Sequence, residues 1–289
     1  MASEREWTVI EALKWTAGDL ESRGVATARL DAELLLADAL GTTRMGLYLA
    51  HDRALSPEER ASVRARLSRR RTGEPVAYIL GVREFYGLPF AVDARVLVPR
   101  PETEFVVDAV LEALPEHAVG GRVLDLGTGS GAIAIAVARA RPTAEIDAVD
   151  VAAGALALAR TNALRHGALR VRFLEGDLFA ALPAPVRYDV VASNPPYIPT
   201  EELAGLPVDV RGFEPALALH GGPDGLAVIR RIVTESAAWL APRGTLVLEI
   251  SVGQAPACAA LLDAAGFDPP RFRRDYAGIE RVVVARRPG

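Results

Sequence analysis

The chain has 289 residues, half of them hydrophobic, and a formal net charge of −4 at pH 7. This length and composition predict one large domain with a smaller one attached, and they exclude a disordered chain. The mild charge argues against a protein whose main task is to follow a long phosphate backbone. The charged first residues and the lack of a long apolar run predict a cytoplasmic protein without a membrane segment. The single cysteine, Cys258, lies in an apolar helical pattern and is predicted to be a buried, inert thiol.

Residues 1–77 are predicted to form a small helical domain. Helical periodicity recurs over residues 8–24, 28–41 and 56–73, and each stretch ends at a glycine. The third stretch carries a row of arginines, which indicates a solvated face or, as the alternative, a docking surface for an acidic or nucleic-acid partner. The row consists of Arg60, Arg64, Arg66, Arg69, Arg70 and Arg71.

The pattern changes after this domain. Residues 78–98 belong to a stretch, starting near Glu74, of short β-like runs separated by glycine and proline, and they are predicted to form a β-hairpin linker. From residue 99 to residue 289 strand-like and helix-like stretches alternate, which is typical of βαβ units in a parallel sheet. Two β-runs near the C-terminus predict a closing hairpin that adds an antiparallel strand at the sheet edge.

The stretch DLGTGSGA, residues 125–132, lies between a predicted strand and a predicted helix. Glycines let the backbone approach a ligand, and a helix N-terminus offers unpaired N–H groups. Asp150 ends the next predicted strand, 19 residues after Gly131, where a carboxylate would reach two ribose hydroxyls. A nucleotide-like cofactor is therefore predicted. The same features satisfy the loose dinucleotide fingerprint, so an NAD-dependent oxidoreductase stays open at this point.

The stretch VVASNPPYIP, residues 190–199, begins as a short apolar run that predicts a strand covered on both faces. Pro195 and Pro196 end it, because each proline restricts φ and lacks an N–H. The Asn194 side chain and the nearby carbonyls are acceptors with few local donors, so the segment would fit a planar group that carries an NH2. A rigid proline-rich turn without a ligand is the alternative.

Other residues separate a transferase from an oxidoreductase. Asp177 ends the third predicted strand, where its oxygens or the adjacent backbone could meet an adenine edge. Hydride transfer needs a group that handles a hydroxyl proton, typically a Tyr–Lys pair or a histidine with a carboxylate. Lys14 lies in the helical domain, and the four histidines lie in loops or at helix ends. The oxidoreductase therefore lacks its catalytic residues.

Together with these motifs, four further stretches resemble the HemK/PrmC family of methyltransferases: residues 73–90, LVPRPETE (97–104), residues 213–226 and RDYAGIERVV (274–283). The resemblance implies a class I S-adenosylmethionine-dependent methyltransferase fold, an α/β fold with a seven-stranded, mostly parallel sheet and an antiparallel edge strand. It also implies methyl transfer from S-adenosylmethionine to the amide nitrogen N5 of the glutamine in the GGQ motif of class-1 peptide chain release factors, which leaves S-adenosylhomocysteine.

The resemblance also implies the site residues. The catalytic residues are expected to be Asn194, Pro195, Pro196 and Tyr197. The cofactor-binding residues are expected to be Gly127, Thr128, Gly129, Ser130, Gly131, Asp150, Asp177, Leu178 and Asn194. In this mechanism the Asn194 oxygen and the Pro195 carbonyl accept the two amide N–H groups, Tyr197 covers the amide plane, and no metal is required.

A DNA or RNA methyltransferase that modifies adenine N6 or guanine N2 is the alternative, because the same acceptors would hold an exocyclic amine. Such enzymes need a basic, aromatic-lined surface that holds the strand. This chain has a net negative charge and only 6% aromatic residues. We therefore expect a protein substrate, no stable nucleic-acid partner and no membrane partner.

Overall fold

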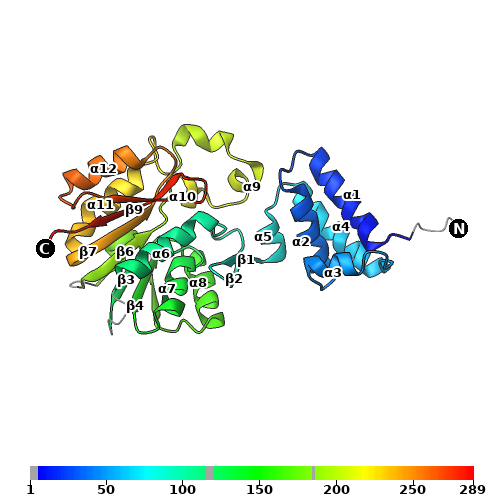
Figure 1. The fold of residues 1–289 in the computed structure, drawn as a ribbon, viewed down its shortest axis with the longest axis horizontal. Helices are drawn as coiled ribbons and strands as arrows, with labels where there is room; N and C mark the ends of the chain where they lie inside the picture. The colour runs from blue at the N-terminus through cyan, green and yellow to red at the C-terminus, as the bar shows by residue number, and fades with distance from the viewer. Residues whose placement is uncertain (1–5, 115–119, 184–185) are drawn as a thin grey trace. The chain divides into compact units, whose positions relative to one another are not determined.

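The computed structural model describes residues 6–114, 120–183 and 186–289. The chain divides into two compact units, coloured from blue to cyan and from cyan to red in Figure 1 apart from one short segment. The helical unit comprises the chain up to Gly81 together with the segment Pro207–Phe213, and the catalytic unit comprises Val82–Leu206 and Glu214–Gly289.

The helical unit confirms the three predicted helices and adds three short ones in its described residues. Its helices are α1 (Val9–Ser22), α2 (Ala28–Ala39), α3 (Arg44–Leu49), α4 (Pro57–Arg71) and α5 (Val76–Leu80), with α9 (Val208–Arg211) from the separate segment. Capping boxes start α1 and α4, where the hydroxyls of Thr8 and Ser56 each accept from the N–H three residues on. The β-like reading was wrong for α5, which follows Pro75 and ends at Gly81 with a φ of 71°.

The predicted solvated arginine face is wrong for Arg70, which is only 7% exposed. Its Nε donates to Asp31 Oδ2 at 2.7 Å, and its Nη1 donates to the carbonyls of Gly73 and Glu74, each at 3.2 Å. Its Nη2 lies 3.5 Å from Asp209 Oδ2 on α9. Arg70 thus joins α2, α4 and α9 inside the helical unit. The neighbouring arginines are more exposed.

The catalytic unit contains a two-stranded hairpin and a seven-stranded sheet. The hairpin pairs β1 (Val82–Phe85) with β2 (Leu88–Ala91) and turns at Tyr86 and Gly87, which both have positive φ, as a two-residue turn of this hand requires. The sheet contains β3 (Arg122–Leu126), β4 (Glu145–Asp150), β5 (Val171–Glu175), β6 (Tyr188–Ser193), β7 (Leu240–Glu249), β8 (Arg271–Arg274) and β9 (Glu280–Arg286). The order of its strands is β5-β4-β3-β6-β7-β9-β8.

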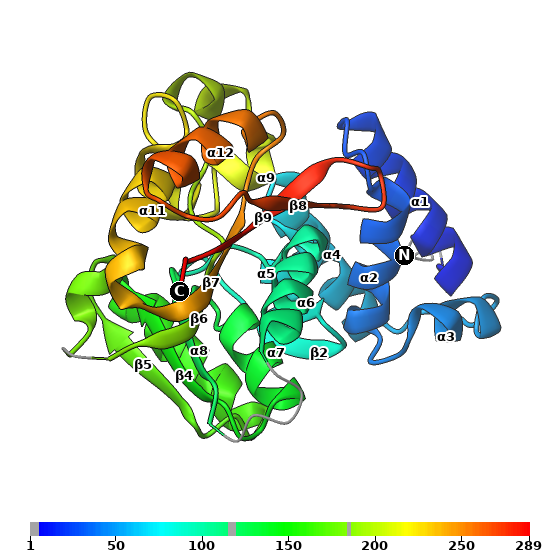
Figure 2. The same ribbon diagram turned by 60° about the vertical axis from the view of Figure 1, so that its left-hand side comes forward.

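Strands β3 to β7 pair in parallel, and β9 pairs antiparallel with β7 and with β8. The mostly parallel sheet with antiparallel pairing at one edge is therefore confirmed, with β9 one place in from that edge. Figures 1 and 2 show α6 (Glu104–Ala113), α7 (Ala132–Ala140) and α8 (Ala153–Arg165) on one face of the sheet and α11 (Ala227–Trp239) and α12 (Ala255–Ala264) on the other. The shorter helices are η1 (Pro101–Thr103), η2 (Leu178–Ala181), η3 (Thr200–Gly205) and α10 (Ala216–Leu219).

The strand order places the chemistry at one edge of the sheet. The chain moves outward from β3 through β4 to β5 and then returns to the other side of β3 as β6. At this switch point the connections from β3 and β6 leave in opposite directions and open a crevice at the carboxyl ends of the strands. The glycine-rich loop, Asp150, Asn194 and Glu249 all lie at carboxyl ends of parallel strands.

Apolar helices cover both faces of the sheet, and Val190, Val191 and Ala192 of β6 are fully buried, as the sequence predicts. Cys258 on α12 is also fully buried, as predicted, and burial raises the pKa of its thiol to about 11. No helix in the described residues combines the length and the apolar character needed to cross a bilayer.

Candidate active site

The glycine-rich loop, residues 127–131, is held in place by β4 and α8. The N–H groups of Gly127 and Thr128 donate to the Val149 carbonyl at 2.8 and 2.9 Å. The Ser130 carbonyl accepts from Asn162 Nδ2 at 2.9 Å. Asn162, which is buried, also bonds both backbone groups of Ala91 in the hairpin. Asn162 is a bracing residue that the sequence did not reveal.

Asp125 accepts two hydrogen bonds that hold the glycine-rich loop against α7. Its Oδ2 accepts from Thr128 Oγ1 at 2.7 Å and from the Ala134 N–H at 3.2 Å. Complete burial raises the pKa of this carboxyl to about 7, against the lowering effect of those two hydrogen bonds. The carboxyl group therefore ties the loop to the first turn of α7.

Asp150 ends β4, as predicted, and contacts the loop directly. Its Oδ2 accepts from the Gly129 N–H at 2.8 Å, and its Oδ1 accepts from the Ala152 N–H at 2.9 Å. Each oxygen keeps a further lone pair, so the carboxylate can brace the loop and still accept from two hydroxyls.

Asp177 and Leu178 lie just after β5, which ends at Glu175, so Asp177 follows the strand and does not end it. Arg231 on α11 donates to both Asp177 oxygens, at 3.2 and 2.9 Å, and the Asp177 side chain is 58% exposed. Leu178 has a φ of 51°, which is unusual for a residue with a side chain and is most often seen where a site imposes it.

The segment that follows β6, residues 194–197, presents acceptors at the switch point. Asn194 Nδ2 donates to Thr103 Oγ1 at 3.0 Å, so the Oδ1 end of the amide points away from Thr103. Neither Asn194 Oδ1 nor the Pro195 carbonyl accepts a hydrogen bond from any other described residue. Asn194 is partly exposed, so its Oδ1 is available to a substrate, whereas Pro195 is buried. Tyr197 directs its hydroxyl to Glu249 Oε1 at 3.3 Å.

A second glycine-bearing stretch packs against this segment. Ile198 donates to the Leu219 carbonyl and accepts from the Gly221 N–H, and the carbonyl of Tyr197 accepts from Gln254 Nε2 at 3.2 Å. A Cβ at Gly221 would lie 2.8 Å from the Pro196 carbonyl oxygen, so only glycine permits the close approach. This contact explains why the stretch around residues 213–226 accompanies the NPPY motif.

Thr103 and Glu249 are polar residues of the site that sequence reasoning did not single out. The Thr103 hydroxyl donates to Glu249 Oε2 at 2.6 Å, and both residues are buried. Burial raises the pKa of Glu249 to about 7, although the bonds from Thr103 and Tyr197 lower it. In the sequence only the motif PRPETE and the end of β7 could have indicated these two residues, since neither is near Asn194.

One open cavity of about 240 Å³ joins these parts. Of the predicted residues, those that line it are Gly127, Thr128, Gly129, Ser130, Asp150, Asp177, Leu178, Asn194 and Pro196. Gly131, Pro195 and Tyr197 do not line it. Gly131 instead is the N-cap residue just before α7, with a φ of 82°, and a Cβ there would lie 2.8 Å from Ile135 Cδ1.

These residues fit S-adenosylmethionine. Gly127 and Gly129 line the cavity, and a Cβ at either would meet no protein atom within 4 Å, so bare backbone faces the space that a ligand would fill. Asp150 would hold the ribose hydroxyls, and the wall at Asp177 and Leu178 would receive the adenine. In the described part of the chain, no three His, Cys, Asp or Glu side chains gather as metal ligands.

Comparisons with known proteins agree with this geometry. Residues 11–81 match the family model of the PrmC N-terminal domain, and residues 103–205 match that of the methyltransferase small domain. A release factor glutamine methyltransferase from Geobacter sulfurreducens is 46% identical over 280 residues, which cover 97% of each chain. The chain belongs to the release factor glutamine methyltransferase family. Another member of this family, from Bordetella pertussis, is 48% identical over 255 residues, which cover 88% of this chain and 93% of that one.

Solved structures support the fold of this family member. A methyltransferase from Pyrococcus furiosus superposes with a TM-score of 0.53 at 18% identity, covering 78% of this chain and 98% of that one. A 16S rRNA N2 G1207 methyltransferase from T. thermophilus superposes with a TM-score of 0.51 at 23% identity, covering 71% of this chain and 49% of that one. At these identities the likeness shows the methyltransferase fold alone.

Replacing Asp150 with alanine in this methyltransferase is expected to weaken S-adenosylhomocysteine binding by about 1.5 to 3 kcal/mol, the range for a hydrogen bond to a charged group. The substitution removes the acceptor for the ribose and the bond to the Gly129 N–H. Isothermal titration calorimetry measures the affinity, with Glu145→Ala as the control because Glu145 lies at the opposite, exposed end of β4. Unchanged affinity in Asp150→Ala would remove this residue from the cofactor site.

Proposed function

We propose that this protein transfers a methyl group from S-adenosylmethionine to the side-chain amide nitrogen N5 of the glutamine in the GGQ motif of class-1 peptide chain release factors. The observation that carries the proposal is the acceptor Asn194 Oδ1, on a residue that lines the cavity fitting the cofactor, with the Pro195 carbonyl next to it in the chain and neither oxygen paired within the described residues. A primary amide presents two N–H donors in one plane, which matches two acceptors. Relatives that match almost the whole chain are named for this reaction.

The mechanism depends on positioning, because an amide nitrogen is a poor nucleophile whose lone pair is delocalised into its carbonyl. The sulfonium of S-adenosylmethionine supplies an activated methyl group. Asn194 Oδ1 and the Pro195 carbonyl hold the two N–H groups so that the nitrogen faces the cavity. The same acceptors stabilise the positive charge that develops on nitrogen during transfer, which is worth about 3 kcal/mol for a well-placed group. The new N–C bond replaces the S–C bond, and the methylated nitrogen then gives one of its two protons to solvent in the open cavity, which leaves a neutral N-methyl amide.

Tyr197 orients the substrate amide in this proposal. Its hydroxyl donates to Glu249 Oε1, which holds the ring beside the acceptors. Burial and the nearby Glu249 carboxyl raise the pKa of Tyr197, so the hydroxyl keeps its proton at neutral pH. The ring therefore covers the amide plane as a neutral group and takes no part in proton transfer.

We also propose a division of labour along the chain: residues 1–77 dock the release factor, residues 78–98 form the hairpin linker, and residues 99–289 carry catalysis. The match of residues 11–81 to a separate family model supports a distinct N-terminal function. The hairpin β1–β2 falls within the proposed linker. A release-factor substrate would place the reaction in the cytoplasm.

Methyl transfer from labelled S-adenosylmethionine tests the proposed function. We expect a purified class-1 release factor to take up about one methyl group per chain and its GGQ glutamine→alanine variant to take up none. Bulk RNA and duplex DNA serve as the competing substrates. If nucleic acid takes up the label and the release factor does not, the assignment is overturned in favour of exocyclic amine methylation.

A further inference from the structure

A series of hydrogen bonds runs from Asn194 to Tyr197 through Thr103 and Glu249, two residues that lie far apart in the sequence. Asn194 Nδ2 donates to Thr103 Oγ1 at 3.0 Å, and Thr103 Oγ1 donates to Glu249 Oε2 at 2.6 Å. The other carboxyl oxygen, Oε1, accepts from the Tyr197 hydroxyl at 3.3 Å. The central bond between Thr103 and Glu249 is buried, with Glu249 1% exposed and Thr103 4% exposed, whereas the bonds of Asn194 and Tyr197 are partly buried.

This series of hydrogen bonds has a direction, which follows from the number of protons available. A threonine hydroxyl carries one proton, and while Glu249 is ionised that proton is given to its carboxylate, which can only accept. A protonated Glu249, whose pKa burial raises to about 7, could itself donate to Thr103, so this direction belongs to the ionised form. In that form Thr103 Oγ1 offers only lone pairs to Asn194, and only the NH2 end of the Asn194 amide can use them. A flipped amide would place Oδ1 against those lone pairs and lose the bond.

We propose that Thr103 and Glu249 are positioning residues that select the orientation of the Asn194 amide, with Oδ1 toward the substrate, and that Glu249 also fixes the Tyr197 ring. The inference rests on the proposed function for its meaning in catalysis, but the orientation itself is a property of the protein alone. An amide in the reverse orientation would present NH2 to the substrate NH2, where neither group can accept.

The surroundings support this role. Thr103 ends η1 and lines the cavity, whereas Glu249 ends β7 next to the strand that carries Asn194. The charge of Glu102 raises the pKa of Glu249, and the charge of Arg281 lowers it. Glu249 thus links three elements, η1, β7 and the segment after β6. Its Oε2 accepts from Thr103, which in turn accepts from Asn194, and its Oε1 accepts from Tyr197.

Three variants test the inference in the full-length protein. Thr103→Val has nearly the same shape but no hydroxyl, so we expect kcat for release-factor methylation to fall about tenfold, the equivalent of one hydrogen bond. We expect the KM for S-adenosylmethionine to stay within about twofold. Thr103→Ser restores the hydroxyl and should recover most of kcat, and Glu249→Gln should lower kcat because its NH2 end can donate where only acceptors are wanted. Thr234→Val, at an exposed position of α11, is the matched control.

A spectroscopic measurement separates this inference from the proposed function. The Asn194 side-chain NH2 signals in a 15N-correlated NMR spectrum, assigned by their loss in Asn194→Asp, should shift in Thr103→Val and not in Thr103→Ser. An unchanged Asn194 signal in Thr103→Val, or equal losses of kcat in the serine and valine variants, would overturn the inference. If the parent protein does not methylate the release factor, the proposed function fails, and the NMR comparison still decides the orientation.

Discussion

Asn194→Ala is expected to lower kcat for release-factor methylation about 10² to 10³-fold while S-adenosylhomocysteine affinity stays within a few-fold. The asparagine oxygen accepts from the substrate amide, and its bond strengthens as positive charge develops on the nitrogen. Loss of the oxygen therefore costs more in the transition state than in the bound complex. Single-turnover kinetics and calorimetry measure the two quantities on the same preparations.

Asn194→Asp sharpens this test because it keeps an acceptor. We expect it to retain more activity than Asn194→Ala, although it loses the bond from Nδ2 to Thr103 and adds a negative charge near the cationic cofactor. Glu201→Ala, in the exposed η3, serves as the control for changes near the segment. Parental kcat in both Asn194 variants would refute the acceptor mechanism and return NPPY to the role of a rigid turn.

Asp31→Ala is expected to lower the free energy of unfolding of the helical unit by about 3 kcal/mol, because it leaves the buried Arg70 guanidinium without its carboxylate. The pair is formed by Arg70 Nε and Asp31 Oδ2 at 2.7 Å, with side chains 7% and 6% exposed. Arg70 keeps its bonds to the carbonyls of Gly73 and Glu74, so the loss should lie at the lower end of the range for broken buried pairs.

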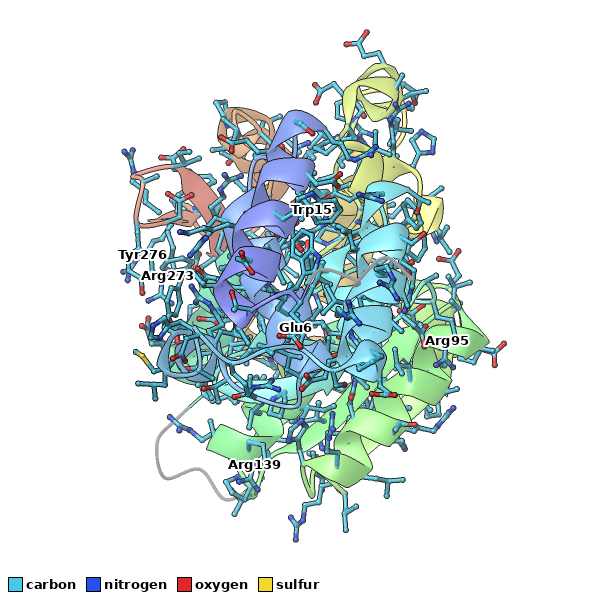
Figure 3. All side chains as sticks on the ribbon, turned by 90° about the vertical axis from the view of Figure 1, so that its right-hand side faces the viewer. Glu6, Trp15, Arg95, Arg139, Arg273 and Tyr276 are labelled. Carbon is cyan, nitrogen blue, oxygen red and sulfur yellow. The ribbon has the colours of Figure 1, made fainter. Side chains whose placement is uncertain are left out.

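Tryptophan fluorescence during urea unfolding can report this unit separately. The chain has three tryptophans, and Trp239→Phe removes the one in the catalytic unit, which leaves Trp7 and Trp15. Trp15 lies on α1 (Figure 3). Asp38→Ala is the matched control, because Asp38 is also on α2 but pairs with Arg66 at the surface, where such a pair contributes about 0 to 1 kcal/mol. Equal effects of the two substitutions would show that burial of the Arg70 pair contributes nothing.

Local chemistry explains what the sequence could predict. Alternating apolar stretches with glycine and proline boundaries specify strands and helices, since periodicity and backbone restriction act over a few residues. DLGTGSG and NPPY are contiguous, and their chemistry follows from their own backbone and side chains. The same local reasoning failed at Val76–Leu80, where β-like residues form a helix between Pro75 and a left-handed Gly81. It also failed for Arg70, whose burial depends on Asp31 in another helix.

The sequence by itself determined the α/β architecture, the cofactor loop and the acceptor segment, because each is encoded by neighbouring residues. Only the tertiary structure decided how they work together. The crossing from β5 back to β6 brings Asp150 and Asn194 to one crevice. The contact between Thr103 and Glu249 spans 146 residues of chain, so no local pattern could reveal it. While Glu249 is ionised, the direction of the Asn194 amide follows from that contact, because a carboxylate can only accept and a hydroxyl has a single proton to give.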